Sequence, residues 1–124
     1  MIDSHVFLWW LADHESLGSA ARELISDPRN QVVVSAASVW EISIKHAQGK
    51  LDIENDLERL VEDEGFDKLS ISLFHAQQAA RLAPIHRDPF DRMLVAQAQA
   101  EGLELMTADL TIPQYGVQIV AARK

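Results

Sequence analysis

The chain has 124 residues, of which 48% are hydrophobic and 24% are charged, and it contains no cysteine. This length suits one domain over residues 1–124, and the lack of cysteine excludes disulfides and thiolate metal sites. The formal net charge of −8 argues against binding of nucleic acid through a general excess of Lys and Arg.

Membrane and export signals are also missing from the sequence pattern. No apolar run approaches the roughly 20 residues that a bilayer-crossing helix needs. The first residues lack the basic segment and small-residue cleavage site of a secretory signal. We therefore expect a cytoplasmic protein that does not enter the membrane.

Short β-branched runs alternate with helical patterns along the chain. Because strands that alternate with helices imply crossover connections, the pattern predicts an α/β fold with a mainly parallel sheet covered on both faces. Such sheets place their functional sites at the carboxyl ends of the strands. In chain order, the periodicity predicts a strand stub at Met1–Ile2, helices at His5–Ala12 and Ser19–Ser26, a strand at Gln31–Ser35, helices at Ser38–Gln48 and Asp56–Glu64, a strand at Lys68–Ile71, helices at Ser72–Leu82 and Pro89–Glu101, and strands at Leu103–Thr107 and Val117–Val120.

Four acidic residues follow predicted strands or open the helix that comes next: Asp3, Glu41, Asp91 and Asp109. The carboxyl ends of parallel strands meet at one edge of a sheet, so we expect these carboxylates to surround one cleft that solvent can reach. Mg²⁺ and Mn²⁺ prefer oxygen ligands, and such ions can activate water for phosphodiester hydrolysis. The four acids are therefore our candidate catalytic residues and metal ligands.

Two of these acids also have a purely structural interpretation at the start of a helix. Ser38 and Glu41 stand three residues apart, as in a capping box, and on the local pattern alone that interpretation is favoured. Asp88 and Pro89 resemble an N-cap followed by a first-turn proline, and Asp91 is then an acid near the positive end of the helix. We assign Asp88 to the cap and keep both interpretations open for Asp91.

The other two acids differ in how well a structural role explains them. Asp109 can also be an ordinary turn residue. Asp3 lies between an apolar stub and the apolar run Val6–Leu11, and a carboxylate beside a core element needs partners or a metal.

Aromatic and basic residues offer further candidates. Trp9, Trp10 and Trp40 can stack on RNA bases, but packing in the core or in a dimer interface is the commoner role for helix aromatics, and we expect it here. Arg92 can contact phosphate or a carboxylate of a partner protein, or can be a solvated surface residue. The five His residues form no H-x-x-x-H pair, so zinc is not expected.

Four segments, in this order, resemble the signature blocks of VapC-type PIN domains. The resemblance spans essentially the whole chain and implies an α/β/α sandwich with a five-stranded parallel sheet. It also implies Mg²⁺- or Mn²⁺-dependent endoribonuclease activity on RNA, a homodimer, and a small antitoxin that covers the active site. The segments are Asp3-Ser-His, Val34-Ser-Ala-Ala-Ser-Val-Trp-Glu-Ile-Ser-Ile-Lys-His, His86-Arg-Asp-Pro-Phe-Asp-Arg-Met-Leu-Val-Ala-Gln-Ala and Leu105-Met-Thr-Ala-Asp.

Carried over by position, the resemblance implies that Asp3, Glu41, Asp91 and Asp109 form the acidic quartet. Ser4 and Thr107 would then be supporting hydroxyls, and Ser4 stands where many relatives have Thr. We also expect the apolar run Val6–Leu11 to contribute to the dimer face, and an antitoxin Arg to approach the acidic cleft.

Two other functions remain open. One is another Mg²⁺-dependent phosphate hydrolase with an aspartate nucleophile, although Asp3-Ser-His lacks the second carboxylate that such enzymes usually place two residues later. The other is a non-catalytic binding module in which the acids serve only as caps. A nuclease should depend on divalent metal for activity and lose that activity when one of the candidate Asp residues is changed to Asn. A binding module should show neither effect.

Overall fold

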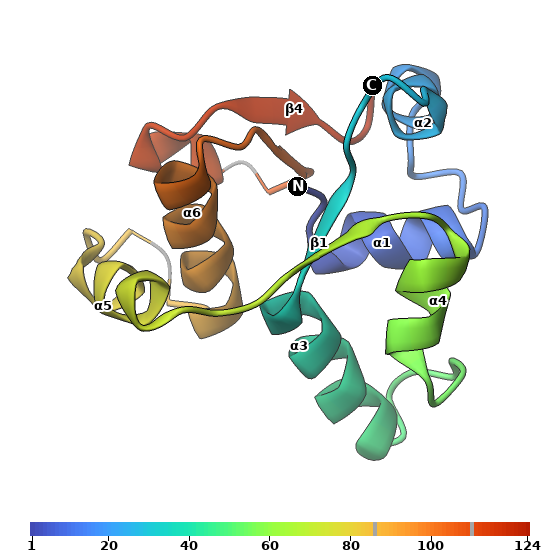
Figure 1. Ribbon diagram of the computed structural model, residues 1–124, viewed down its shortest axis with the longest axis horizontal. Coiled ribbons are helices and arrows are strands. Elements are labelled where there is room, and N and C mark those ends of the chain that lie inside the picture. The colour runs from blue at the N-terminus through green and yellow to red at the C-terminus, as the bar shows by residue number, and fades with distance from the viewer. Residues whose placement is uncertain (86, 110) are drawn as a thin grey trace.

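The computed structural model describes residues 1–85, 87–109 and 111–124 (Figure 1). His86, which belongs to the third of the quoted segments, lies outside the described residues. The helices are α1 Ser4–Leu11, α2 Ser19–Ser26, α3 Ala36–Ala47, α4 Leu57–Asp63, α5 Leu73–Arg81 and α6 Pro89–Glu101, the strands are β1 Val33–Ser35, β2 Asp67–Leu69, β3 Leu105–Thr107 and β4 Ile119–Ala121, and η1 Ile112–Tyr115 is a 3₁₀ helix.

The strands form two parallel pairs. β1 pairs with β2, with Val34 opposite Lys68, and β3 pairs with β4, with Met106 opposite Val120. Between the pairs lies Ile2, which forms an isolated parallel bridge with Met106 and donates its N–H to the Val33 carbonyl over 3.1 Å.

The predicted five-stranded sheet is therefore not confirmed. The predicted stub supplies a single bridging residue instead of a strand, because α1 begins at Ser4, immediately after Asp3. The hydrogen bonds of residues 1–3 nevertheless join the β1 side to the β3 side, as the Asp3 N–H donates to the Met106 carbonyl over 3.2 Å.

Helices pack on both faces of these strands, as the burial of neighbouring residues shows. Val33 and Leu105 belong to one buried apolar cluster, together with Leu94 of α6. The next residues along the same strands, Val34 and Met106, belong to the other cluster, which includes residues of α1, α2 and α4. This alternation with a period of two is what strands covered on both faces require.

Local signals explain where the best-predicted helix begins and ends. The Asp88 carboxylate accepts a 2.9 Å hydrogen bond from the Phe90 N–H, with Pro89 in the first turn. Gly102 ends α6 with φ 65°, a left-handed conformation that glycine adopts without a steric cost. The predicted and observed bounds of α6 are therefore identical, and Asp88 is confirmed as a cap.

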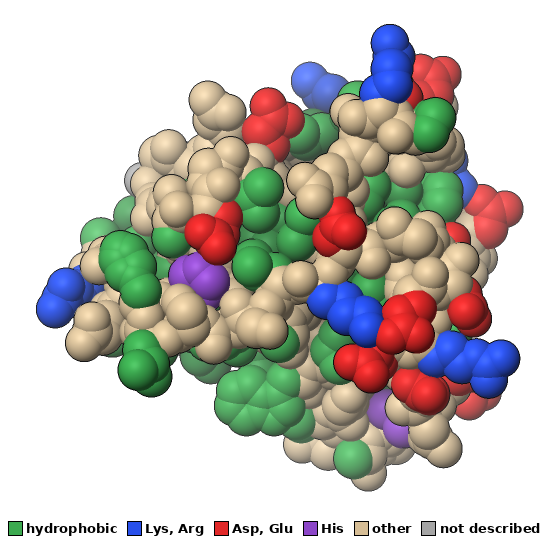
Figure 2. Space-filling view, in the orientation of Figure 1, with side chains coloured by type: hydrophobic (Ala, Val, Ile, Leu, Met, Phe, Trp, Pro, Cys, Tyr) green, Lys and Arg blue, Asp and Glu red, His purple; other side chains and the backbone are tan. Residues whose placement is uncertain are grey.

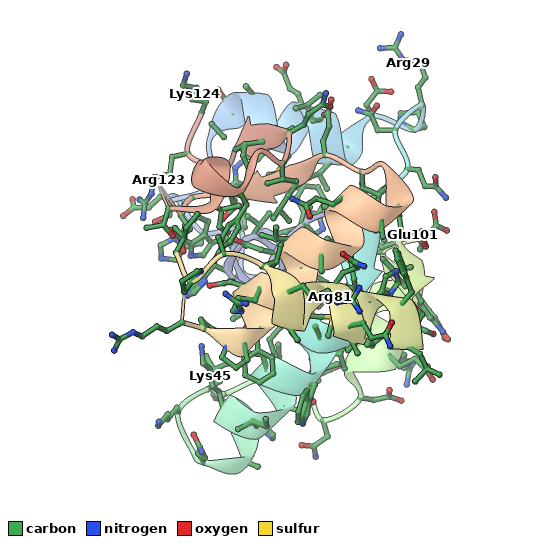
Figure 3. All side chains as sticks on the ribbon, turned by 90° about the vertical axis from the view of Figure 1, so that its left-hand side faces the viewer. Arg29, Lys45, Arg81, Glu101, Arg123 and Lys124 are labelled. Atoms are coloured by element: carbon green, nitrogen blue, oxygen red, sulfur yellow. The ribbon has the colours of Figure 1, made fainter. Side chains whose placement is uncertain are left out.

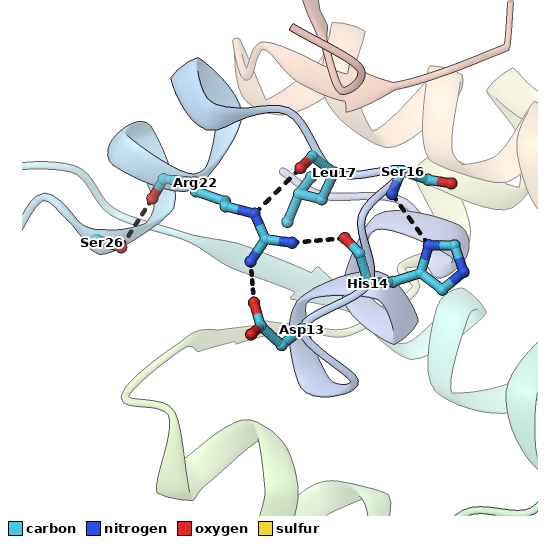
Figure 4. A network of polar contacts seen from close by, with 6 residues as sticks. All are labelled: Asp13, His14, Ser16, Leu17, Arg22 and Ser26. Carbon is cyan, nitrogen blue, oxygen red and sulfur yellow. Dashed lines mark hydrogen bonds and ion pairs between the residues drawn. The ribbon is translucent and has the colours of Figure 1, made fainter.

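The loop between α1 and α2 is held by one guanidinium (Figure 4). Arg22 donates to the Leu17 carbonyl over 3.1 Å, to the Asp13 carboxylate and to the His14 carbonyl. Asp13 has φ 50°, which is unusual for a residue with a side chain. The contacts from Arg22 therefore secure a loop that contains a left-handed residue.

None of the helices in the described part of the chain has the length and apolar character needed to span a bilayer. The longest, α6, has 13 residues.

Candidate active site

Asp3 lies at the junction between strand pairing and the first helix. Its N–H bonds to β3, and its Oδ1 accepts a 2.9 Å hydrogen bond from the Val6 N–H, so the side chain caps α1. Only 4% of the residue is exposed. The carboxylate is therefore held at a fixed position at the carboxyl end of β3, between β3 and α1.

Burial raises the pKa of the Asp3 carboxyl above its ordinary value. Hydrogen bonds from the Thr107 side chain and the Val6 N–H, and the charge of His5, lower this pKa, while the nearby charge of Glu41 raises it. The desolvation outweighs the hydrogen bonds, so the charged form of Asp3 is incompletely compensated.

Glu41 lies in the second turn of α3, because the helix begins at Ala36 and its N-cap is Ser35. The interpretation of Glu41 as the third residue of a capping box with Ser38 is therefore wrong. Ser38 is inside the helix, and its buried hydroxyl is the one such side-chain atom without a hydrogen-bond partner in the described part of the chain. The structure thus removes the structural explanation that competed with a functional role for Glu41.

Glu41 is buried, with 6% of the residue exposed, and its carboxylate has two polar partners. Its Oε1 accepts a 2.6 Å hydrogen bond from the Ser4 hydroxyl, and its Oε2 lies 3.1 Å from the Lys45 ammonium. Ser4 thus bonds Glu41, and Thr107 lowers the pKa of Asp3, while the supporting role of both hydroxyls in catalysis stays a prediction.

Asp109 is joined to the same region through Thr107. Its N–H donates to the Thr107 Oγ1 over 3.0 Å. Its Oδ1 accepts two 2.8 Å hydrogen bonds, from the N–H and the hydroxyl of Thr111. Oδ1 of Asp109 therefore has the role of an ordinary turn residue. That Asp109 is also a metal ligand stays a prediction.

Asp91 and Arg92 lie in the first turn of α6. Asp91 is half-buried. Its helix, α6, contacts α3, which contains Glu41, and β3, which is followed by Asp109. The Arg92 guanidinium donates to three carbonyls at and after the end of α5, those of Ala79, Leu82 and Ala83, over 2.9 to 3.0 Å. These contacts give Arg92 a structural role, and its supporting role in catalysis stays a prediction.

The oxygen atoms available here suit a hard divalent cation. The candidate ligands are carboxylates, supported by hydroxyls, and the buried charge of Asp3 is one that a cation would compensate. Within residues 1–85, 87–109 and 111–124, however, no three His, Asp or Glu side chains stand close enough together to hold one ion. The convergence of all four acids on a metal therefore stays a prediction.

A groove of about 430 Å³ runs beside Glu41. One wall is α3, with Glu41 and Lys45, and the other is the start of α6, with Asp88 and Phe90. Lys50 and Arg87 complete the lining, so three cations gather here.

Sequence reasoning missed a second polar network, which joins Ser35, the N-cap of α3, to Gln97 of α6. The buried Gln97 of α6 accepts a hydrogen bond from the Ser35 hydroxyl and donates to the Ser70 carbonyl over 3.3 Å. Its amide nitrogen also lies 3.4 Å from the buried His75 Nδ1. The one local signal was Ser35 at the end of a strand, a position that favours an N-cap.

The predictions about apolar residues are confirmed in part. Trp9 and Trp10 pack against the core, but Trp40 is 61% exposed and belongs to neither apolar cluster, so core packing is wrong for Trp40 and its packing in a dimer interface stays a prediction. Val6 and Phe7 are fully buried, and Leu8 to Leu11 are partly buried against the same cluster, so a contribution of the run Val6–Leu11 to a dimer face stays a prediction for its partly exposed residues only. Exposed apolar side chains also lie on α5, where Leu73 is 88% exposed.

Both the sequence and the fold are similar to those of known proteins. Residues 1–117 match the PIN domain family. A protein named Ribonuclease VapC22, from Mycobacterium tuberculosis (strain ATCC 25618 / H37Rv), is 28% identical over 113 residues, which are 88% of this chain and 85% of that protein.

Solved structures show the same fold at low sequence identity. A chain of a toxin-antitoxin complex from Klebsiella pneumoniae superposes with a TM-score of 0.69 at 18% identity, covering 98% of this chain and 95% of that one. A chain of FitAcB from Neisseria gonorrhoeae superposes with a TM-score of 0.70 at 18% identity, covering 98% and 96%.

Proposed function

The chain belongs to the PIN domain family, and on that basis we propose that it is a metal-dependent endoribonuclease, the toxin of a VapBC-type toxin–antitoxin pair. The similarity to a protein named Ribonuclease VapC22 along 88% of the chain supports the ribonuclease activity. The likeness to a chain from a toxin-antitoxin complex is in keeping with the proposed pairing.

One observation carries the assignment of the site. Asp3 and Glu41 are two buried carboxylates, close enough for the charge of Glu41 to raise the pKa of Asp3. Glu41 accepts a hydrogen bond from the Ser4 hydroxyl and pairs with Lys45, whereas Asp3 has no ion pair within the described residues. Two buried acids near each other are costly unless a positive charge compensates them. A binding module that used its acids only as caps would not need this pair.

We propose that Asp3, Glu41, Asp91 and Asp109 hold Mg²⁺ or Mn²⁺. When bound, such an ion lowers the pKa of a coordinated water and neutralises charge on the leaving oxygen of a phosphodiester. Ser4 and Thr107 would keep the Glu41 and Asp3 carboxylates oriented toward the ion. Arg92 would support the site indirectly, by fixing the start of α6, which carries Asp91.

We also propose a small VapB-like antitoxin and a homodimer as partners. An antitoxin Arg would pair with the acidic residues in place of metal, because guanidinium and carboxylate form strong bidentate hydrogen bonds. The exposed apolar side chains of α5, Leu73 and Phe74, are the candidate dimer face. Purification with the neighbouring gene product, followed by measurement of mass in solution, tests both.

A cleavage assay on structured RNA tests the activity. Mg²⁺ or Mn²⁺ should start cleavage and EDTA should stop it, and Asp91→Asn should abolish it. Asp88→Asn is the matched control, because Asn caps a helix as well as Asp does, so this variant should cleave as the wild type does. Cleavage that persists in EDTA, or an Asp91→Asn variant as active as Asp88→Asn, would overturn the proposal.

A further inference from the structure

An exposed aromatic surface lies beside the proposed site. Trp40 immediately precedes Glu41 in α3, and its ring contacts Phe90 of α6 edge to face, with centroids 5.2 Å apart and planes at 75°. Phe90 lines the groove that contains Glu41. With 61% of the residue exposed, Trp40 is an aromatic residue open to solvent and fixed in position by its neighbour.

The same groove carries cations that the protein does not neutralise. Several other Lys and Arg side chains are paired with acids, as Lys68 is with Glu58 and Glu62. Figure 2 shows Lys and Arg side chains among Asp and Glu side chains on this face of the molecule. Lys50 and Arg87, by contrast, have no ion-pair partner within the described residues, and both line the groove.

This arrangement is informative because the protein as a whole is acidic, with a formal charge of −8. Uncompensated cations at a groove that leads to Glu41 are complementary to a polyanion. An exposed aromatic ring next to them is complementary to the flat face of a nucleobase.

We propose that the groove binds a single-stranded segment of RNA, with Lys50 and Arg87 contacting phosphates and one unstacked base lying on Trp40. The inference rests on the proposed ribonuclease function and assigns where its substrate lies. Bases in a duplex are stacked on one another and cannot lie on Trp40 unless they are splayed out, so the groove selects loops and unpaired segments.

Trp40 also borders an apolar hollow of about 280 Å³ on its other side, formed with α4 and β2. That hollow could receive a protein segment, but its lysine, Lys68, is already paired with two acids. Lys50 and Arg87, which have no ion-pair partner in the described structure, line the groove on the Glu41 side and not this hollow. The charge distribution therefore favours RNA over a protein segment at this ring.

Fluorescence anisotropy in EDTA measures binding without cleavage. The probe is a short labelled single-stranded RNA, with the corresponding duplex as a comparison. Trp40→Leu keeps an apolar side chain but removes the large ring, and it should weaken binding roughly 5-fold to 150-fold, the range for one base stacked on an aromatic side chain. Trp40→Phe should restore most of the affinity, and Leu24→Ala, at an exposed position on α2, should leave binding unchanged.

The cations are tested through salt dependence. Lys50→Ala and Arg87→Ala should each reduce the slope of log affinity against log salt by about 0.7, the value for one phosphate contact to a single strand. Lys124→Ala is the matched control, because Lys124 lies at the opposite end of the molecule from Lys45 of this groove (Figure 3), and its slope should stay that of the wild type.

Three results would overturn the inference. In the first, the probe binds Trp40→Leu as tightly as it binds wild type. If wild type still cleaves RNA in a metal-dependent way, the proposed ribonuclease function stands and only this binding site is wrong. In the second, the duplex binds as tightly as the single strand. In the third, Trp40→Leu changes the mass in solution while RNA binding is unaffected, which would assign the ring to a protein interface.

Discussion

The Ser4 hydroxyl donates a 2.6 Å hydrogen bond to Oε1 of Glu41, a residue 37 positions later in the chain. The bond joins the first residue of α1 to the middle of α3 and supplies one of the two polar partners of a buried carboxylate. The other is Lys45, one helical turn further along α3.

Replacing Ser4 with Ala should lower the free energy of unfolding by about 1–3 kcal/mol, the cost of leaving a buried acceptor without its donor. Ser4→Thr should restore the loss, because the hydroxyl is kept. Urea denaturation measures both. The exposed Ser26 hydroxyl, which donates to the Arg22 carbonyl, is the control, and Ser26→Ala should change stability by no more than about 0.5 kcal/mol.

Asp3→Asn should become more stable relative to wild type as pH rises, in the absence of metal. The folded-state pKa of Asp3 lies above its unfolded value, so protonation stabilises the fold. That contribution is complete below the unfolded pKa, about 4, and is lost as pH rises through the folded pKa. Urea denaturation in EDTA over a pH series measures the difference, and a relative stability that falls with pH would contradict the assignment.

The same variant should lose most of its stabilisation by metal. A ligand that binds only the folded state adds about 2.7 kcal/mol at a hundredfold excess over its Kd. Asn keeps the helix cap of Asp3 but not its charge, so wild type should gain this energy from Mg²⁺ or Mn²⁺ and Asp3→Asn should not. Equal rises in melting temperature for the two proteins would show that Asp3 is not a ligand.

Helices were predictable where local signals agreed, and contacts between distant elements were not. α6 carries a cap, a first-turn proline and a terminal glycine, and its bounds were predicted correctly. For α3, Ser35 and Ser38 both suit an N-cap, and Glu41 three residues after Ser38 favoured the wrong one. Ser35 is the cap because it ends β1 and its hydroxyl also reaches Gln97, 62 positions away.

The candidate site was predictable as a set of residues but not as an arrangement. Alternation of strands and helices was enough to place the acids near strand ends. It could not show that Ser4 would bind Glu41 and Thr107 would bind Asp3, because those pairings depend on how α1 packs against α3 and β3. Exposure of Trp40 was likewise decided by packing, since a helix aromatic in an apolar run is usually buried.

Gln97→Leu should destabilise the protein by about 1–3 kcal/mol, because the Ser35 hydroxyl and the Ser70 carbonyl each lose a buried partner. The matched control is Gln99→Leu, two residues along α6, where the exposed side chain donates to the Tyr115 carbonyl. That change should cost no more than about 0.5 kcal/mol. Denaturation of the two variants compares them directly, and equal losses would contradict a structural role for the Gln97 network.

Arg92→Leu should loosen the end of α5, because the last carbonyls of a helix have no partners within it and Arg92 supplies donors to two of them and to the Ala83 carbonyl. Hydrogen exchange should show faster exchange of amides over residues 73–81 than in wild type. A variant with unchanged exchange but no RNA cleavage would instead assign Arg92 to catalysis.

The contact between Ile2 and Met106 also determines when, during synthesis, the proposed site can first form. The hydrogen bonds of residues 1–3 to β3 must wait for a partner made 104 residues later. At about 5–20 residues per second, that delay is roughly 5 to 20 seconds. Asp3 cannot meet Thr107 before then, so a nascent chain lacks the proposed acidic site until β3 has been translated.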